Sequence, residues 1–229
     1  MDIQLLELGN EANKVLVIDQ LVPQPESIIG LASHLAPFPD VSSNFYPGMR
    51  HLITPQQTEA FEYVTKTCHL IAPYLSTHLG IGGFHIREAS FSLVTQTPDK
   101  LQPIQCIPHY DTLDHKHFAI LHYLHPTNMG GTGFYRHKRT GFERLSEGRY
   151  GLYKRALDLD LDRYGEPAKI YMRQSTQAWE NIGEVEWLYN RIVVYQGAMF
   201  HTGLISEGFE FNSDPKQGRL TGNIFIGSN

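Results

Sequence analysis

Three side chains in this sequence have the types and spacing of an iron site. His109 and Asp111 lie two residues apart, so in an extended strand both side chains leave the same face. His201 follows an apolar run, residues 192–195, that is typical of a buried strand. Two imidazoles and one carboxylate form a set that holds Fe(II) on one side and leaves the opposite coordination positions open. We therefore predict that His109, Asp111 and His201 bind a metal.

A basic residue beyond the second histidine extends this pattern. Arg219 begins the next apolar strand, residues 219–226, and a guanidinium can bind a carboxylate through two parallel hydrogen bonds. Thr221 lies on the same strand face and offers a hydroxyl. We expect a hairpin between His201 and Arg219 to bring the guanidinium towards the metal. A dicarboxylate cosubstrate such as 2-oxoglutarate could bind the metal at one end and the Arg219 guanidinium and Thr221 hydroxyl at the other.

Plainer explanations compete with each assignment. In a chain with 12 histidines, His109 and Asp111 also fit a turn or strand-edge pair hydrogen-bonded to the backbone. Arg219 fits a surface salt bridge, and Thr221 is at home in any strand. The combination with His201 and the flanking strands favours metal and cosubstrate binding.

Composition narrows the class of protein. The 229 residues fit one domain, and 41% hydrophobic with 19% charged residues describes an ordinary soluble globular chain. A net charge of −5 argues against nucleic acid or anionic membrane as the main partner. No apolar stretch approaches the roughly 20 residues that span a bilayer, and no secretion signal is apparent. Cys68 and Cys106 form no metal or disulfide pattern, so we expect a cytoplasmic protein.

The elements that must position these residues follow from the spacing of apolar residues. Two helices are predicted near the N-terminus, and Pro73 is expected to kink or end the second. The strands 117–125 and 132–138 are expected to form a hairpin. Residues 145–181 read as a partly helical insertion, with helix formers at 152–161 and 168–179. The helices are predicted at 25–35 and 55–79, and the strands at 15–19, 84–97, 117–125, 132–138, 186–198 and 219–226.

Helices before a run of strands, with a helical insertion before the closing strands, predict an α+β fold with a β-rich core. A double-sheet jelly roll is the architecture that best fits, because it brings inward residues of facing strands together and can enclose a site.

With these motifs, the sequence resembles the 2-oxoglutarate- and Fe(II)-dependent oxygenases, in particular the prolyl-4-hydroxylase-like branch. The resemblance runs from about Val15 to Ile226 and includes the segment VLVIDQLVPQPESI, similar to that branch's first strand and helix. His109-Tyr110-Asp111 and His201 match its metal ligands, and Arg219-Leu220-Thr221 resembles its pair for the distal carboxylate of 2-oxoglutarate. Tyr123 matches a tyrosine that often binds the same carboxylate.

The resemblance implies a double-stranded β-helix with N-terminal helices packed on one sheet. It also implies a hydroxylase that couples oxidative decarboxylation of 2-oxoglutarate to C–H oxidation of a small-molecule or peptidyl substrate, with O2 consumed. A second copy of the chain is a candidate partner. The interval from His201 to Arg219 is longer than usual in that branch, so an extended hairpin loop is expected there.

Two other functions stay open at this point. A cupin-like metal enzyme would not use 2-oxoglutarate, and His115-Lys116-His117 resembles the His-x-His of cupins, although no glutamate follows between Ile120 and His125. A non-catalytic binding module on the same barrel is the third candidate, and the intact ligand set argues against it.

Overall fold

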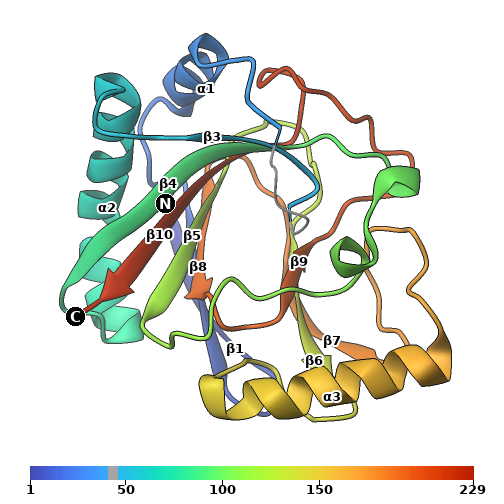
Figure 1. Cartoon of the computed structure of the whole chain (residues 1–229). Helices are drawn as coiled ribbons and strands as arrows, with labels where there is room; N and C mark the ends of the chain where they lie inside the picture. Colours follow the sequence, from blue (N-terminus) through green and yellow to red (C-terminus); the bar gives the residue numbers. More distant parts are fainter. Residues whose placement is uncertain (41–45) are drawn as a thin grey trace.

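The computed structural model describes residues 1–40 and 46–229, which form two antiparallel sheets that face each other (Figure 1). The strands are β1 (Asp2–Leu8), β2 (Asn13–Asp19), β3 (Gly48–Leu52), β4 (Phe84–Val94), β5 (His117–Tyr123), β6 (Thr132–His137), β7 (Trp179–Val185), β8 (Arg191–Gln196), β9 (His201–Gly203) and β10 (Leu220–Ser228). The helices are α1 (Pro25–His34), α2 (Thr58–Leu79) and α3 (Glu147–Tyr164), with 3-10 turns at Pro98–Lys100 and Pro103–Cys106. The large sheet has the order β1-β2-β8-β5-β10-β4-β3, and the small sheet has the order β7-β6-β9.

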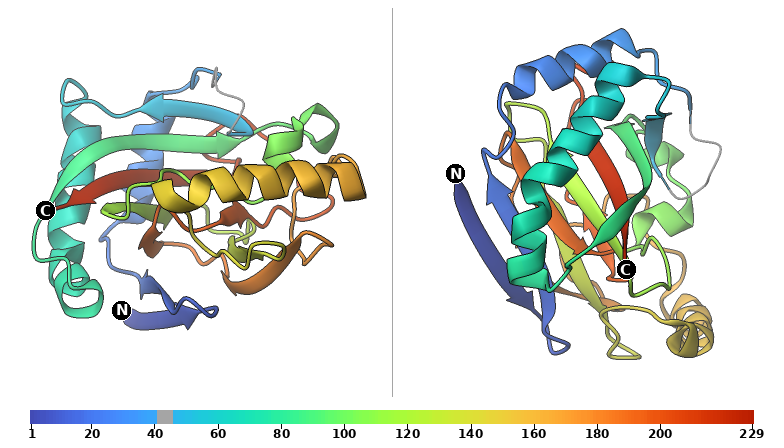
Figure 2. Two further views of the ribbon diagram at one scale, coloured as in Figure 1. Left: turned by 60° about the horizontal axis from the view of Figure 1, so that its bottom comes forward. Right: turned by 90° about the vertical axis from the view of Figure 1, so that its left-hand side faces the viewer.

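Helices α1 and α2 cover the outer face of the large sheet, as the right-hand view of Figure 2 shows. In α2 the buried residues Val64, Cys68, Ile71 and Leu75 recur every three or four positions, so they share one face of the helix. Pro73 lies on the exposed side, and α2 continues past it to Leu79, so the helix does not end at this proline, and a local kink stays a prediction. The buried turns on either side of the proline pack on the sheet and hold the helix together. This arrangement confirms the predicted helices on one sheet.

The inner faces of the two sheets meet over only part of their area. Val17 of β2, Val193 of β8 and Ala119 of β5 are buried against Phe134 and Val185 of the small sheet. These strands form the closed, apolar half of the sandwich. The other half of the large sheet consists of β10, β4 and β3, and its inward-facing side chains include buried polar residues.

Both predicted hairpins are wrong. Strand β5 pairs with β8 and β10 in the large sheet, whereas β6 pairs with β7 and β9 in the small one. The connection from β9 to β10 likewise crosses between sheets instead of returning beside its own strand. Alternation along a strand shows which face it buries but does not specify which strand pairs with it. The pairing depends on contacts between segments distant in sequence.

The predicted helix at 168–179 is also wrong, whereas the one at 152–161 lies inside α3. Tyr171 and Met172 are buried there in an irregular segment, and Thr176 accepts a hydrogen bond from the Trp179 backbone at 3.1 Å where β7 begins. Only the first part of β7 lies within the predicted insertion at 145–181, and β1, β3 and β9 were not predicted.

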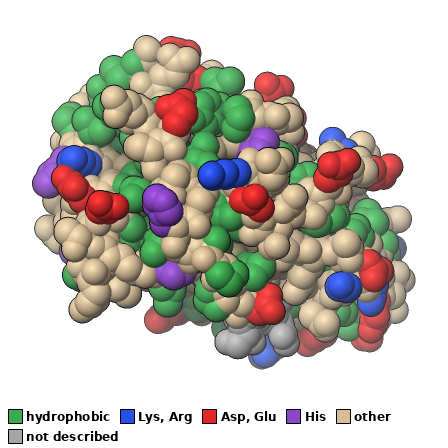
Figure 3. Space-filling view, turned by 90° about the horizontal axis from the view of Figure 1, so that it is seen from above, with side chains coloured by type: hydrophobic (Ala, Val, Ile, Leu, Met, Phe, Trp, Pro, Cys, Tyr) green, Lys and Arg blue, Asp and Glu red, His purple; other side chains and the backbone are tan. Residues whose placement is uncertain are grey.

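The described residues contain no helix that is long and apolar enough to cross a membrane. On the face seen in Figure 3, basic side chains are few and lie among acidic, apolar and histidine side chains. That face, where the figure draws it in colour, carries no extended basic patch.

Candidate metal and cosubstrate site

The open half of the large sheet turns polar side chains inward. On β4, Ser90 and Ser92 alternate with apolar residues that pack under the helices. On the neighbouring strand, Thr221 and Asn223 face the same way, directly after Arg219, and Asn223 donates to Ser92 at 2.6 Å. All five residues are buried. Polar groups in a sheet interior are costly unless something satisfies them, so this face has the character of a ligand site.

The three predicted metal ligands lie together beside this polar face. The backbones of His109 and His201 pair as an antiparallel bridge, with N–H···O distances of 3.0 and 2.8 Å. Their ring centroids are 4.2 Å apart. Nε2 of His201 lies 3.8 Å from Oδ1 of Asp111, and one ligand atom from each of the three residues lies within 4.8 Å of the others. The structure therefore brings His109, Asp111 and His201 to one point from separate parts of the chain.

The protonation of the two imidazoles suits a metal ion. Nδ1 of His201 donates to the Met199 carbonyl at 2.9 Å, which leaves the lone pair of Nε2 free to bind a cation. Burial lowers the pKa of His109 to about 3 and that of His201 to about 4, so both rings are neutral at neutral pH. Burial also raises the pKa of Asp111, an effect that a bound cation would oppose. The donor set fits a divalent ion such as Fe(II).

A glycine allows Asp111 to reach its position. The Asp111 N–H donates to the Gly197 carbonyl at 2.7 Å. A Cβ at Gly197 would lie 3.3 Å from Cβ of Asp111 and 2.7 Å from the ring of His117. The close approach of these two segments therefore depends on a residue without a side chain.

Arg219 is buried near the metal ligands, with 6% of its surface exposed. Its Nε and Nη2 atoms donate to the carbonyls of Met129, Gly130 and Gly131 at 2.9–3.2 Å. Gly130 has φ +80°, a backbone conformation that favours glycine. Among the described residues no carboxylate pairs with this guanidinium, and Nη1 makes no hydrogen bond. Arg219 is thus a fixed, buried cation held by neutral acceptors.

The guanidinium of Arg219 lies close to the strand that carries the candidate metal ligand His201. A Cβ added to Gly203, two residues after His201, would lie 3.6 Å from Nη2 of Arg219. Although the predicted hairpin is wrong, the crossover from β9 to β10 places the guanidinium inside the sandwich. Its carbon lies 4.9 Å from the ring centroid of Trp187. Burial lowers the pKa of Arg219, and nearby phenols partly oppose this effect: Tyr123, Tyr46, Tyr171 and Tyr195.

The other two predicted cosubstrate residues lie beside Arg219. Tyr123 stacks on Trp187 with ring centroids 4.4 Å apart, and its hydroxyl shares a 2.7 Å hydrogen bond with Thr132. Thr221 is opposite Tyr123 in the pairing of β10 with β5, so the two side chains lie on the same face. The structure brings Arg219, Tyr123 and Thr221 to one end of the polar face.

Approach of Arg50 to the pocket and a surface role were both compatible with the sequence, but its pairing with Glu88 at the other end of the polar face was not predicted. Nη2 of Arg50 lies 2.9 Å from Oε1 of Glu88 and 2.9 Å from Oγ of Ser90. The signal was present in β4, where Glu88, Ser90 and Ser92 alternate with apolar residues. A strand whose inward-facing side chains are polar indicates a polar ligand cavity rather than a packed hydrophobic core.

The fold is similar to that of solved proteins that bind 2-oxoglutarate or are described as dependent on it. HygX from Streptomyces hygroscopicus, solved with nickel and 2-oxoglutarate bound, matches with a TM-score of 0.54 at 14% identity, covering 96% of this chain and 84% of HygX. SnoN, a non-heme alpha-ketoglutarate-dependent epimerase from nogalamycin biosynthesis, matches with a TM-score of 0.54 at 12% identity, covering 94% of this chain and 79% of SnoN. At these identities the likeness shows the fold, and it confirms the predicted double-stranded β-helix.

The chain belongs to a family described as DUF6445, a family of unknown function, whose sequence profile matches residues 1–226. No curated protein sequence matches it significantly.

Proposed function

We propose that this protein is an Fe(II)- and 2-oxoglutarate-dependent oxygenase, most similar in mechanism to the prolyl-4-hydroxylase-like branch, and that it hydroxylates its substrate. One observation carries the proposal: a buried guanidinium without a carboxylate partner lies beside two histidines and an aspartate arranged as metal ligands. Burying an unpaired charge costs several kcal/mol, on the order of the penalty for removing an ion from water. A dicarboxylate that also reaches the metal would offset that cost at Arg219.

The residues of the site fall into a metal-binding group and a cosubstrate-binding group. His109, Asp111 and His201 hold the metal through neutral imidazoles and an ionised carboxylate. Arg219 binds the distal carboxylate of the cosubstrate, with Thr221 and Tyr123 supplying hydroxyls on the same face. When bound, Fe(II) together with 2-oxoglutarate and O2 supplies oxidative decarboxylation and the oxidation of a substrate C–H bond. The apolar half of the sandwich and the ring of Trp187 keep water away from the guanidinium, which strengthens its attraction for a carboxylate.

The first test is spectroscopic. Anaerobic addition of Fe(II) and 2-oxoglutarate should give a weak visible charge-transfer band, and the band should be absent in His109→Ala and His201→Ala. Succinate release in air, measured with 2-oxoglutarate alone, separates this function from a metal enzyme that does not use 2-oxoglutarate. A folded protein that neither binds Fe(II) by calorimetry nor shows the band would contradict the proposal.

The second test isolates the cosubstrate. Arg219→Met should leave Fe(II) affinity unchanged, because the residue binds no metal, and should weaken 2-oxoglutarate binding at least tenfold, since hydrogen bonds to a charged group contribute about 1.5–3 kcal/mol. The same change should alter stability little, because removing a buried charge without a counter-ion offsets the loss of its hydrogen bonds to the carbonyls of residues 129–131. Unchanged 2-oxoglutarate affinity in Arg219→Met would remove Arg219 from the site.

A further inference from the structure

A β-bulge in β4 places two adjacent charged residues on the side of the sheet that carries the metal ligands. The pairing with β10 shifts register between Phe225 and Ile226, so that Phe225 is opposite Glu88 while Ile226 is opposite Ile86. Arg87 is the extra residue. A bulge interrupts the strict alternation of a strand and redirects a side chain, and bulges are common beside active sites.

The contacts of both side chains confirm their direction. Nη2 of Arg87 lies 2.6 Å from Oδ2 of Asp114, and its Nη1 lies 3.4 Å from Nδ1 of His117. The ring of His117 lies against the segment that carries Asp111, as the close approach to Gly197 shows. Glu88, the next residue, pairs with Arg50. Two charged pairs therefore flank the edge of the site at which Asp111 lies.

Arg50 and Glu88 are better placed to hold a ligand than an ordinary surface pair. The guanidinium of Arg50, whose side chain is 24% exposed, also donates to the fully buried Ser90 hydroxyl. Its Nε and Nη1 atoms make no hydrogen bond with described residues, and neither does Oε2 of Glu88. Glu88 directly follows Arg87, whose guanidinium reaches His117 beside the segment that carries Asp111, so the pair lies at that edge of the site. Among the residues that the structure describes, one edge of the Arg50 guanidinium and one oxygen of Glu88, whose side chain is 45% exposed, therefore have no partner at this edge of the site.

This pair is separate from the cosubstrate end of the face. Arg50, Ser92 and Thr221 form one row across three strands, and Arg219 lies two residues beyond Thr221. Arg50 and Arg219 are thus separated by two strand spacings across the sheet and by two residues along β10. Together these steps place their Cα atoms about 12 Å apart. The side chain of Arg50 is directed towards Ser90 and Glu88, away from Arg219. The two arginines are therefore positioned for different ligands.

We propose that Arg50 and Glu88 recognise the primary substrate and that this substrate is a zwitterion with an ammonium and a carboxylate attached to the same carbon, as in a free α-amino acid. The carboxylate binds the free edge of Arg50 and the ammonium binds the free oxygen of Glu88, so that four charges alternate in sign. The two groups are joined by a 2.9 Å contact between Nη2 of Arg50 and Oε1 of Glu88, so a ligand that reaches both must carry its two charges close together, as an α-amino acid does. The inference rests on the proposed function, because it assigns the second ligand of that site.

The experiment measures binding without turnover. The full chain is equilibrated with Zn(II) and 2-oxoglutarate and titrated by calorimetry with each of the common free L-amino acids, then with the N-acetylated and the amidated form of any that binds. We expect at least one free amino acid to bind, and each blocked form to bind at least tenfold more weakly because it lacks one charge. Binding by no free amino acid, or equal binding by a blocked form, overturns the proposal.

Variants locate the site. Arg50→Gln and Glu88→Gln should each weaken binding of that amino acid at least tenfold, and Lys66→Gln, which removes the cation of an exposed pair on α2, should not change it. The double variant R50E/E88R restores an ion pair, so a purely structural role predicts full recovery of both stability and binding. We expect recovery of stability only. Tight binding by Arg50→Gln, or recovered binding in the double variant, would contradict the proposal.

Failure of the inference and failure of the proposed function give different results. If Zn(II) and 2-oxoglutarate bind and no free amino acid does, only the inference fails. If an amino acid binds through Arg50 and Glu88 while 2-oxoglutarate does not bind at all, the proposed function fails and the recognition site stands.

Discussion

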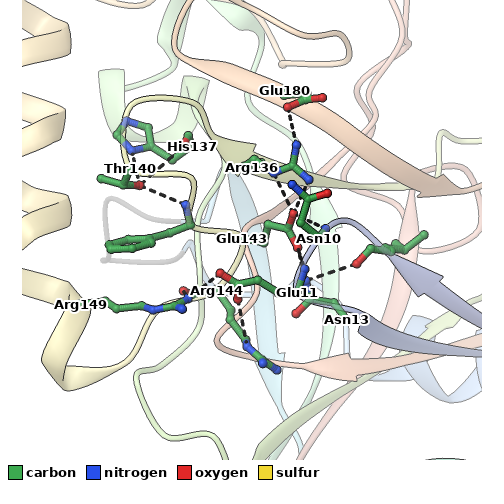
Figure 4. A network of polar contacts seen from close by, with 12 residues as sticks. Asn10, Glu11, Asn13, Arg136, His137, Thr140, Glu143, Arg144, Arg149 and Glu180 are labelled. Atoms are coloured by element: carbon green, nitrogen blue, oxygen red, sulfur yellow. Dashed lines mark hydrogen bonds and ion pairs between the residues drawn. The ribbon is translucent and has the colours of Figure 1, made fainter.

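Glu143 and Asp111 are both carboxylates that the fold largely removes from water, and their surroundings differ sharply. The side chain of Glu143 is fully buried, and Figure 4 shows how completely it is satisfied. One oxygen accepts from the Asn10 backbone at 2.7 Å and from Arg136; the other accepts from the Glu11 backbone at 2.9 Å and from the side chain of Asn13 at 2.7 Å. This network ties the turn between β1 and β2 to the segment that leads into α3.

Asp111 has no such set of partners. Its side chain is 18% exposed, it makes no hydrogen bond with described residues, and its nearest basic atom is Nε2 of His201 at 3.8 Å. The cations differ in the same way: Arg136 pairs with Glu143 and Glu180, whereas the partners of Arg219 among the described residues are backbone carbonyls. A buried charged group that is paired with opposite charges or hydrogen-bond donors of the chain stabilises the fold. A buried charged group without such partners indicates a ligand site.

The largest expected difference between the two carboxylates concerns metal binding. Asp111→Asn should abolish Fe(II) binding, or weaken it by more than about 100-fold, since even groups that only support a metal ligand change affinity by about 10- to 100-fold. Its free energy of unfolding without metal should stay within about 1 kcal/mol of the original, because no partner is lost. Calorimetric titration with Fe(II) and denaturant unfolding measure the two quantities, and a large loss of stability would show that Asp111 is structural.

Glu143→Gln should have the opposite outcome. Breaking a buried ion pair costs about 3–5 kcal/mol, because Arg136 and two backbone N–H groups lose their anionic acceptor. Urea unfolding should show this loss, while Fe(II) affinity should be unchanged. Glu62→Gln, in an exposed pair on α2, is the control and should cost less than about 1 kcal/mol. A matching loss of metal affinity in Glu143→Gln would mean that the two regions are not independent.

The next effect concerns a neutral buried group that the chain satisfies. His122 lies between the hydroxyl of Tyr63 at 3.1 Å and Oδ1 of Asn190 at 2.9 Å, and burial lowers its pKa to about 4. The unfolded chain, with a histidine pKa of about 6.5, binds more protons between these values, so stability should fall by up to about 3 kcal/mol as pH drops from 6.5 to 4. Unfolding at several pH values should show a shallower fall in His122→Gln, and an unchanged slope would refute this assignment.

The smallest effect concerns the glycine that brings Asp111 into place. Gly197→Ala should weaken Fe(II) binding about tenfold, because the new methyl group presses on Asp111 and His117 and shifts a ligand without removing it. Gly148→Ala in α3, where a Cβ meets no atom within 4 Å, is the matched control. Equal metal affinity in the two variants would show that the backbone adjusts freely at Gly197.

The candidate metal ligands were recognisable in the sequence because the pattern depends on residue types and short spacings. The two-residue spacing of His109 and Asp111 and the imidazole after an apolar run are local patterns, and Arg219 at the start of an apolar strand is another. The helices α1 and α2 were predictable for the same reason, since their periodicity and their proline or glycine boundaries are local. Strand pairing was not, and both predicted hairpins failed.

The charged pair of Arg50 and Glu88 shows why the remainder needed the structure. Arg50 stands in a short strand without a strong pattern, and 38 residues separate it from Glu88. Only the placement of β3 beside β4 and the bulge at Arg87 bring their charges to the metal ligands.

By itself, the sequence determined which donor atoms the protein offers and where the two N-terminal helices and several of the strands lie, because these follow from side-chain chemistry and local periodicity. The tertiary structure decided which of those groups are left without partners. Whether a charge is satisfied depends on residues brought together from distant parts of the chain, as Glu143 is by Asn10 and Asn13 and as Asp111 and Arg219 are not.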